Sequence, residues 1–427
     1  MLLKNKNTIK IMVLSIFNIS LLLIAQLVAE PILILISMGV YLITMFASDD
    51  ETVLPLFLFF LPWSTLLKLS PTSISFYSIA TILVFFKYLI RHPRFERRLI
   101  WIVGGLFVVT FVAKVLHGYG ISASYFMFFI MLVAFPFIYK FIENKVDFEQ
   151  CVRFFAIGII LATICSLIFG SHPNLIQYVR VIEEERINVT RLCGFYGDPN
   201  FYSAQIVATF GGLLLTISKK KRHSIFNIGL AAAVVVCGMI SLSKSFLICT
   251  FLVFALWIFS VLFYGPSKII AIAFVVGVLG LFLFDSGSFN NLIDQYILRF
   301  GTSTDASTLT TGRSDLWYDY TMFLLRNPKE LIFGQGYTSV FNGVRKGSHN
   351  TIIQAVYQLG FFGSIVFALW LKQFKSKVKQ VNKRNVLIYV VWIVSCFSMW
   401  MGLDMMFFDD FFINIMLFSV GCKYISE

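Results

Sequence analysis

The chain has 427 residues, of which 58% are apolar and only 13% are charged, about half the charged share of an average soluble protein. This composition excludes a soluble enzyme, a disordered chain and a collagen-like chain, because one soluble domain could not bury so much apolar surface. The net charge of +13 would indicate a nucleic-acid-binding protein only if the basic residues gathered on one surface.

Apolar runs follow one another along the chain, each close to the length of about 17–25 residues that a helix needs to cross a bilayer. We expect 11 to 14 spans, because several runs are short and one contains two prolines. In chain order the runs are 9–28, 31–47, 52–67, 72–90, 98–116, 121–142, 151–170, 199–217, 225–241, 245–263, 268–284, 350–371, 386–402 and 406–421. The sequence therefore predicts an all-α integral membrane protein, a bundle of helices in which residues 1–427 form one polytopic domain.

Basic residues gather at alternate ends of these runs. With the N-terminus in the cytoplasm and alternating spans, the cytoplasmic side carries 23 basic and 8 acidic residues, and the other side carries 12 and 14. An excess of Lys and Arg on the cytoplasmic side is what the positive-inside rule describes. The positive charge therefore indicates membrane topology, and we expect no nucleic-acid partner.

Two segments on the expected extracytoplasmic side are long, 171–198 and 285–348. Loops carry chemistry more often than the helices that they connect, so an active site would face outward. The larger segment contains an expected amphipathic helix near 313–326, because Leu316, Tyr320, Phe323 and Leu324 share one helical face. Such a helix lies against the membrane or roofs a cavity between spans.

The second long segment ends in a basic stretch that leads directly into an apolar run. It contains Arg345, Lys346, His349 and Asn350. The positive end of the helix dipole disfavours an imidazolium, so His349 is expected to be neutral and able to act as a general base. The alternative is a capping or headgroup-level His, and Ser348 or Asn350 could cap the helix.

Polar residues also surround the start of the run at 199–217. Asp198 before Pro199 is typical of a helix N-cap, and we interpret Asp198 mainly in that way. Arg191 lies just above the same helix, where either a bound phosphate or a lipid headgroup would explain it. Asn200 is a candidate for capping or for ligand binding.

Lys244 stands among three serines between two apolar runs, in Ser241-Leu242-Ser243-Lys244-Ser245. Ionisable groups at membrane depth are costly and tend to line cavities or pathways. The alternative is a lysine whose ammonium extends to the interface.

Four of these features occur in one order. They are Arg-x-x-Gly-x-x-x-Asp-Pro-Asn (191–200), Ser-x-Ser-Lys-Ser (241–245), Thr-Gly-Arg-Ser-x-Leu-Trp (311–317) and Ser-His-Asn-Thr (348–351), followed by a Gly-x-x-Gly bend at 360–363. This arrangement resembles the O-antigen polymerase and O-antigen ligase superfamily of bacterial envelope enzymes. The motifs cover about residues 190–371, and hydropathy alone covers the rest.

The resemblance implies a fold related to the membrane-embedded GT-C glycosyltransferases and a bacterial plasma-membrane location. It implies undecaprenyl-pyrophosphate-linked oligosaccharides as substrates, membrane lipid as surroundings, and no metal or other cofactor. By the same likeness, His349 is the candidate base, with Arg191 and Arg313 as catalytic pyrophosphate clamps. Lys244, Asn200, Asp198, Asn350 and Arg345 are then candidates for binding the pyrophosphate or glycan. Relatives often carry Arg at the position of Lys244.

Three activities remain open at this point. A polymerase would join lipid-linked repeat units into capsule, exopolysaccharide or O-antigen, with a flippase and a chain-length regulator of the same pathway as possible partners. A ligase would transfer a lipid-linked glycan to a different acceptor. A flippase for lipid-linked oligosaccharides should show repeated halves, which the sequence lacks, and a purely structural protein would leave the Arg and His residues unexplained. We favour the polymerase, on resemblance to polymerases of capsule and exopolysaccharide.

Overall fold

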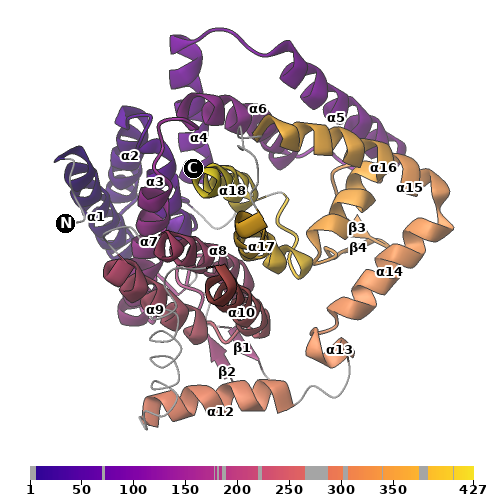
Figure 1. Cartoon of the computed structure of the whole chain (residues 1–427). Helices are drawn as coiled ribbons and strands as arrows, with labels where there is room; N and C mark the ends of the chain where they lie inside the picture. Colours follow the sequence, from indigo (N-terminus) through magenta and orange to yellow (C-terminus); the bar gives the residue numbers. More distant parts are fainter. Residues whose placement is uncertain are drawn as a thin grey trace.

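The computed structural model describes residues 6–69, 73–176, 178–179, 182–184, 189–219, 224–264, 287–301, 306–338, 340–374, 383–406 and 408–427. Helices dominate it (Figure 1). The N-terminal helices are α1 (Lys6–Val28), α2 (Pro31–Ala47), α3 (Val53–Phe60) with the 3₁₀ turn η1 (Leu61–Trp63), α4 (Phe76–Arg91), α5 (Arg97–Leu116), α6 (Ala123–Ile142) and α7 (Phe148–Phe169). Most of them match the expected apolar runs, but α3 and α4 are shorter than predicted.

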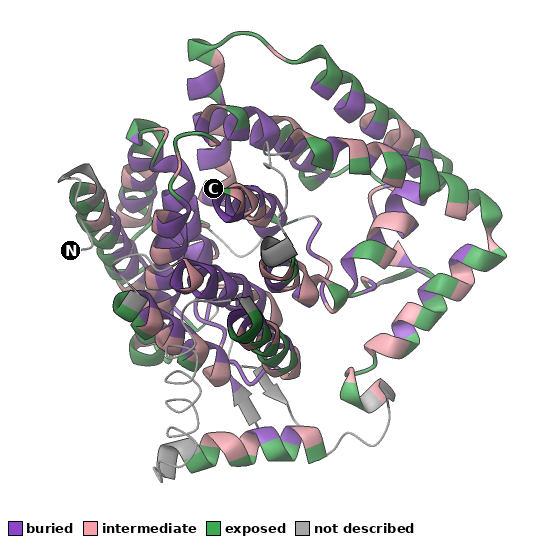
Figure 2. Cartoon of the chain, in the orientation of Figure 1, coloured by how far each residue is buried: buried purple, intermediate pink, exposed green. Residues whose placement is uncertain are grey.

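The second half of the bundle surrounds α8 (Pro199–Ser218), whose residues are almost all buried. This helix packs against α7, α9 (Ser224–Ile240), α10 (Lys244–Tyr264) and α17 (Lys383–Phe397). Figure 2 shows the same contrast, with buried residues along α7 and α8 and exposed ones along α5 and α16 (Thr351–Leu371). The bundle is completed by η2 (Lys372–Phe374), η3 (Ser398–Met401) and α18 (Asp409–Ser426).

Seven of the described helices are long and apolar enough to cross a membrane. They are Ile9–Val28, Arg97–Leu116, Ala123–Ile142, Phe148–Phe169, Pro199–Ser218, Lys244–Phe263 and Thr351–Phe374. Shorter apolar helices cover Pro31–Ala47, Val53–Trp63, Ile225–Ile240 and Val386–Met401. The expected span 268–284 lies outside the described residues. The chain is thus an all-α, multi-pass membrane protein by the length and composition of its helices.

The two long connecting segments contain secondary structure of their own. The first holds the hairpin β1 (Ile182–Glu184) and β2 (Val189–Arg191). The second holds α12 (Gly287–Gly301), α13 (Ala306–Leu309), α14 (Arg313–Arg326), α15 (Pro328–Phe333) and the hairpin β3 (Val340–Phe341) and β4 (Val344–Arg345). In Figure 1 the helices α12, α13 and α14 run along one side of the molecule, from below α10 to α16. The helix α14 covers the segment in which an amphipathic helix is expected.

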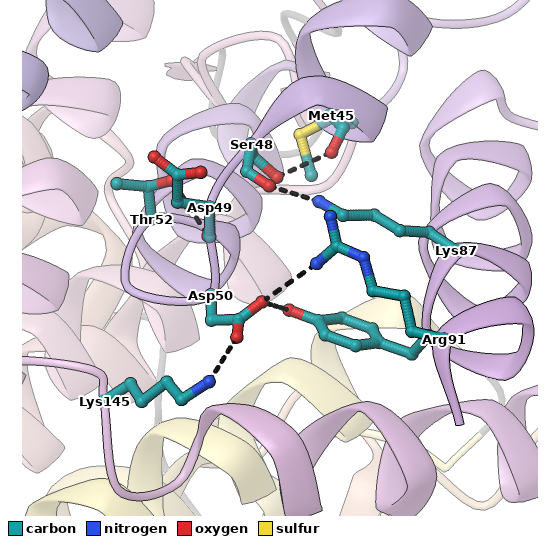
Figure 3. Close-up of polar contacts among 9 residues, drawn as sticks. Met45, Ser48, Asp49, Asp50, Thr52, Lys87, Arg91 and Lys145 are labelled. Carbon is teal, nitrogen blue, oxygen red and sulfur yellow. Dashed lines mark hydrogen bonds and ion pairs between the residues drawn. The ribbon is translucent and has the colours of Figure 1, made fainter.

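Polar contacts join the turns at each end of the bundle, as alternating spans require. At the expected cytoplasmic end, Asp50 accepts from Lys145 at 2.5 Å and from Tyr88 at 2.8 Å, and Arg91 lies 3.7 Å away (Figure 3). Lys87 in the same cluster donates to the Ser48 carbonyl. At the other end, Gln26 donates to the Leu66 carbonyl at 3.1 Å and Asn174 donates to the Leu27 carbonyl at 2.9 Å. These contacts connect turns that the charge pattern places on the same side.

The segment after α15 is fixed to α16 by a close approach of two backbones. Gly360 bends α16 with φ 65° and ψ −178°, and Gly334 follows α15 with φ 78°. A Cβ on Gly334 would lie 2.4 Å from the Gln358 carbonyl oxygen, and a Cβ on Gly360 would lie 2.4 Å from the Gly334 nitrogen. Next to this contact the amides of residues 335 and 336 donate to carbonyls of α16 at 2.8 and 2.9 Å. Positive φ and this close approach both require glycine at these two positions.

Candidate active site

The turn between α9 and α10 is the centre of the candidate site. It consists of Ser241, Leu242 and Ser243, and Leu242 has a φ of 50°, which is uncommon for a residue other than glycine. Two guanidinium groups hold this turn through its carbonyls. Arg191 of β2 donates from Nε to the Ser241 carbonyl at 3.3 Å, and Arg299 of α12 donates from Nη1 to the Leu242 carbonyl at 2.5 Å. The turn is therefore held in an unusual conformation by two buried cations.

The start of α8 lies against the same turn. Asn200 accepts on Oδ1 from Nη2 of Arg191 at 3.2 Å and from the Ser243 hydroxyl at 2.9 Å. Asp198 accepts the backbone amides of residues 200 and 201 at 2.7 and 3.1 Å. The predicted N-cap role of Asp198 is confirmed, and Asn200 positions Arg191.

A third cation begins the next helix. Lys244 is the first residue of α10, and its Nζ lies 5.6 Å from the ring centroid of Phe300, next to Arg299. Arg191, Lys244 and Arg299 thus come from three separate segments and gather around one turn. Three cations around hydroxyl groups and a strained turn form an arrangement that suits a phosphate or pyrophosphate group.

Arg313 reaches this region from the first turn of α14. Its Nη1 lies 3.0 Å from the position of a Cβ on Gly402, and the Ser245 hydroxyl lies 3.9 Å from the same position. Burial lowers the pKa of Arg313, and the charge of Asp198 partly opposes this effect. Within the described part of the chain, its guanidinium has no hydrogen-bond or ion-pair partner. A largely buried cation without such a partner is well placed to receive an anionic ligand.

His349 is presented on strained backbone between two fixed neighbours. Its φ is 51°, whereas Ser348 and Asn350 are buried. The backbone N–H of Ser348 donates to Oε1 of Gln354 in α16 at 2.9 Å, and the Ser348 hydroxyl donates to the Asn350 carbonyl at 2.9 Å. His349 as a whole residue is still exposed, whereas both of its neighbours are buried. Strained backbone held by its surroundings is often found at functional sites.

Desolvation and neighbouring positive charges together lower the pKa of His349 and favour its neutral form. Desolvation lowers the pKa of His349, and the positive charge of Arg313 lowers it further, against the opposing effect of Asp198. The imidazole therefore stays unprotonated below its ordinary pKa of about 6.5. Arg313, Asp198 and His349 act on one another electrostatically, which places the start of α14, α8 and α16 around one space.

Of the two remaining candidates, Asn350 has a structural role, and only the backbone of Arg345 is described. Asn350 caps α16, accepting from the amides of residues 352 and 353 at 3.0 and 3.1 Å, and its Nδ2 donates to the Met401 carbonyl at 3.1 Å. The backbone of Arg345 pairs with Val340 in the β3–β4 hairpin, but the Arg345 side chain is outside the described part of the structure. Asn350 therefore contributes by fixing the helix that follows His349.

Asp404 completes the surroundings of the candidate site, although none of the sequence motifs contains it. It lies in the turn before α18, and its Oδ2 is 3.3 Å from the position of a Cβ on Gly347. Burial raises the pKa of Asp404 to about 7. Its Oδ1 is buried and has no hydrogen-bond partner among the described residues. Asp404 is therefore a largely desolvated carboxyl group next to the segment that precedes His349.

The structure thus brings Arg191, Lys244, Asp198 and Asn200 together around the α9–α10 turn, with Arg313 and His349 on the adjoining side. Arg299 was missed, because it lies in no motif and its position near a helix C-terminus is common for basic residues.

The comparison with protein-family models and the comparison with curated protein sequences give no match to the chain.

Proposed function

We propose that this protein polymerises undecaprenyl-pyrophosphate-linked oligosaccharide repeat units into a surface polysaccharide, at the outer face of the bacterial plasma membrane. The observation that carries the proposal is the position of a neutral, exposed His349 beside Arg313, next to the cations of the α9–α10 turn. A pyrophosphate ester needs cations at its leaving group, and an attacking hydroxyl needs a base.

In the proposed donor site, the pyrophosphate lies between Arg313, Lys244 and Arg191. Guanidinium groups suit paired phosphate oxygens because they present two parallel donors, whereas Lys244 acts as a point charge. Arg299 supports this site by holding the Leu242 carbonyl. The helical start of α10 adds its backbone amides and positive dipole to the same region.

In the proposed reaction, a sugar hydroxyl of the acceptor attacks the anomeric carbon of the donor glycan. The new C–O bond forms as the bond between the anomeric carbon and the phosphate oxygen breaks. The electron pair leaves with undecaprenyl pyrophosphate, whose negative charge the three cations stabilise. The hydroxyl proton passes to the neutral imidazole of His349, which returns it to water after the product leaves.

Complementation in the host tests this proposal. The gene is deleted and restored as wild type, His349→Ala or Arg313→Ala at matched protein level, and the surface polysaccharide is separated on a gel. We expect the wild-type ladder to collapse to single repeat units with either variant. Long chains that persist on the lipid carrier would instead indicate a ligase, and an accumulation of repeat units on the cytoplasmic side would indicate a flippase. An unchanged ladder would overturn the proposal.

A further inference from the structure

A cavity of about 780 Å³ lies on the outer half of the molecule, beside the candidate site. Its walls come from the turn after η1, the starts of α4 and α6, the start of α8 and the start of α18. This volume falls within the usual range for small-molecule sites, about 300–1,000 Å³. The cavity opens beside Asp198, which acts electrostatically on both Arg313 and His349.

Hydroxyl groups line this cavity to an unusual extent. Six serines contribute to it, which are Ser64, Ser73, Ser75, Ser78, Ser122 and Ser124. Ser122 and Ser124 are exposed, and their hydroxyls lie 2.8 Å apart at the start of α6. Ser78 donates to Asp409 at 3.0 Å. A wall of short hydroxyls can both donate to and accept from the hydroxyls of a ligand.

Acidic groups exceed basic ones in the same lining. Asp198, Asp409 and Asp410 face a single lysine, Lys68. Asp410 is fixed by a hydrogen bond from Tyr196 and by one from Gln205 at 2.7 Å. Each carboxylate oxygen retains a lone pair after these contacts, because a carboxylate has about four acceptor positions. A ligand with hydroxyl donors therefore matches these acceptor positions better than an anionic group, which offers no donor.

Aromatic side chains supply the remaining wall. Tyr178, Tyr196, Phe201, Tyr337 and Phe408 line the cavity. Tyr196 and Phe201 are stacked with ring centroids 5.9 Å apart, and Phe408 meets Phe201 edge-on at 4.7 Å. Their flat apolar faces suit the C–H faces of a sugar ring, while the serines and carboxylates suit its hydroxyls. The combination distinguishes this cavity from the cationic site around the α9–α10 turn.

We infer that this cavity binds the acceptor glycan through uncharged, hydroxylated sugar rings and disfavours rings that carry a carboxylate. The assignment of the bound glycan as the acceptor rests on the proposed function, whereas the binding of a neutral glycan to this cavity does not depend on it. The cavity and the cationic site then hold the two substrates on opposite sides of Asp198, with His349 between them. The α8 start, which carries Asp198 and Asn200, forms the wall that the two sites share.

Binding to the purified full-length protein in nanodiscs tests the inference with two probes. The first probe is the repeat oligosaccharide released from the lipid carrier by mild acid, used with its primary alcohols intact and with them oxidised to carboxylates. The second probe is inorganic pyrophosphate. Dissociation constants are measured by saturation-transfer NMR and by equilibrium dialysis for wild type, Ser124→Phe, Asp409→Asn and Arg191→Ala.

We expect Ser124→Phe to weaken binding of the intact oligosaccharide by about tenfold or more, because it removes a hydroxyl from the lining and places a phenyl ring in the cavity. Pyrophosphate binding should stay within twofold. The matched control is Ser20→Phe, at an exposed serine of α1 far along the chain from the cavity lining. Arg191→Ala should show the reverse pattern, with weaker pyrophosphate binding and unchanged oligosaccharide binding. Asp409→Asn should reduce the preference for the intact over the oxidised oligosaccharide.

Several results would overturn the inference. These are oligosaccharide binding by Ser124→Phe within twofold of wild type, competition between oligosaccharide and pyrophosphate, or an unchanged preference in Asp409→Asn. An altered preference between the two oligosaccharides in Asp409→Asn cannot arise from misfolding, because misfolding would weaken the binding of both. If these tests succeed while His349→Ala leaves the polysaccharide ladder unchanged, the proposed function fails and the glycan-binding cavity stands.

Discussion

Replacing Gly402 by alanine tests whether the guanidinium of Arg313 is positioned for catalysis. Gly402 follows η3, and its φ of −118° is accessible to any residue, so the backbone accepts the change. The new Cβ would lie 3.0 Å from Nη1 of Arg313. An ordinary contact of this kind is about 3.5 Å, so the guanidinium has to move by about 0.5 Å.

The size of the expected effect follows from this displacement. A misplacement of about 1 Å can lower an enzymatic rate about 10²-fold, so a shift of about half that distance should lower it about tenfold. Arg313→Ala removes the charge altogether and should cost about 10²-fold or more. Because the side chain of Arg313 is flexible at its end, Gly402→Ala should leave the melting temperature unchanged.

The assay is polymer formation by purified protein in nanodiscs, measured as the initial rate with lipid-linked repeat units. Gly104→Ala is the matched control, because Gly104 is exposed on α5 and a Cβ there meets nothing within 4 Å. A full rate for Gly402→Ala together with an inactive Arg313→Ala would refute the reasoning, because Arg313 would then act from another position. An equal loss in Gly104→Ala would show that the effect is not specific to Arg313.

Three further changes have defined outcomes. Arg299→Met removes the charged donor of the buried Leu242 carbonyl, so the free energy of unfolding should fall by about 1.5–3 kcal/mol and polymer should be lost. Arg299→Lys should recover part of both. Thermal unfolding measures the stability, and the polysaccharide gel measures the polymer. The neutral form of His349 should persist somewhat below pH about 6.5, so the polymerisation rate should fall only at lower pH. In Arg313→Gln this fall should begin at a higher pH, because the charge of Arg313 lowers the pKa of His349. Burial alone would raise the pKa of Asp50, but hydrogen bonds from Lys145 and Tyr88 outweigh it and lower the pKa. Stability from Asp50 is therefore fully present above pH about 4 and lost as pH falls through the lowered value, so Asp50→Asn should flatten the acid decline in melting temperature.

The apolar pattern predicted most of the helices because each span must carry its own hydrophobic run. The helix at 313–326 could also be placed, since its apolar face repeats with a helical period and Asn327-Pro328 ends it. The lengths of α3 and α4 could not be predicted in the same way. Pro62 lies in a 3₁₀ turn after α3, so the apolar run 52–67 is not one continuous helix.

Residues at the candidate site were predictable where a local motif contained them and not where only folding brings them together. Arg191, Lys244, Arg313 and His349 stand in short polar motifs beside apolar runs, whereas Arg299 contacts Leu242 across 57 residues of sequence. The cavity is a similar case, because its six serines come from separate segments.

The contact between Gly334 and Gly360 joins the segment after α15 rigidly to the apolar helix α16. To lift this segment from α16 would expose the amides of residues 335 and 336 and the carbonyls that they bond, at a cost for each polar group left unpaired. The connection from Gly334 toward His349 is thus anchored at its start on α16. If the proposed polymerase activity holds, the growing glycan would have to slide past this anchored segment at each addition, because the segment does not lift to release it.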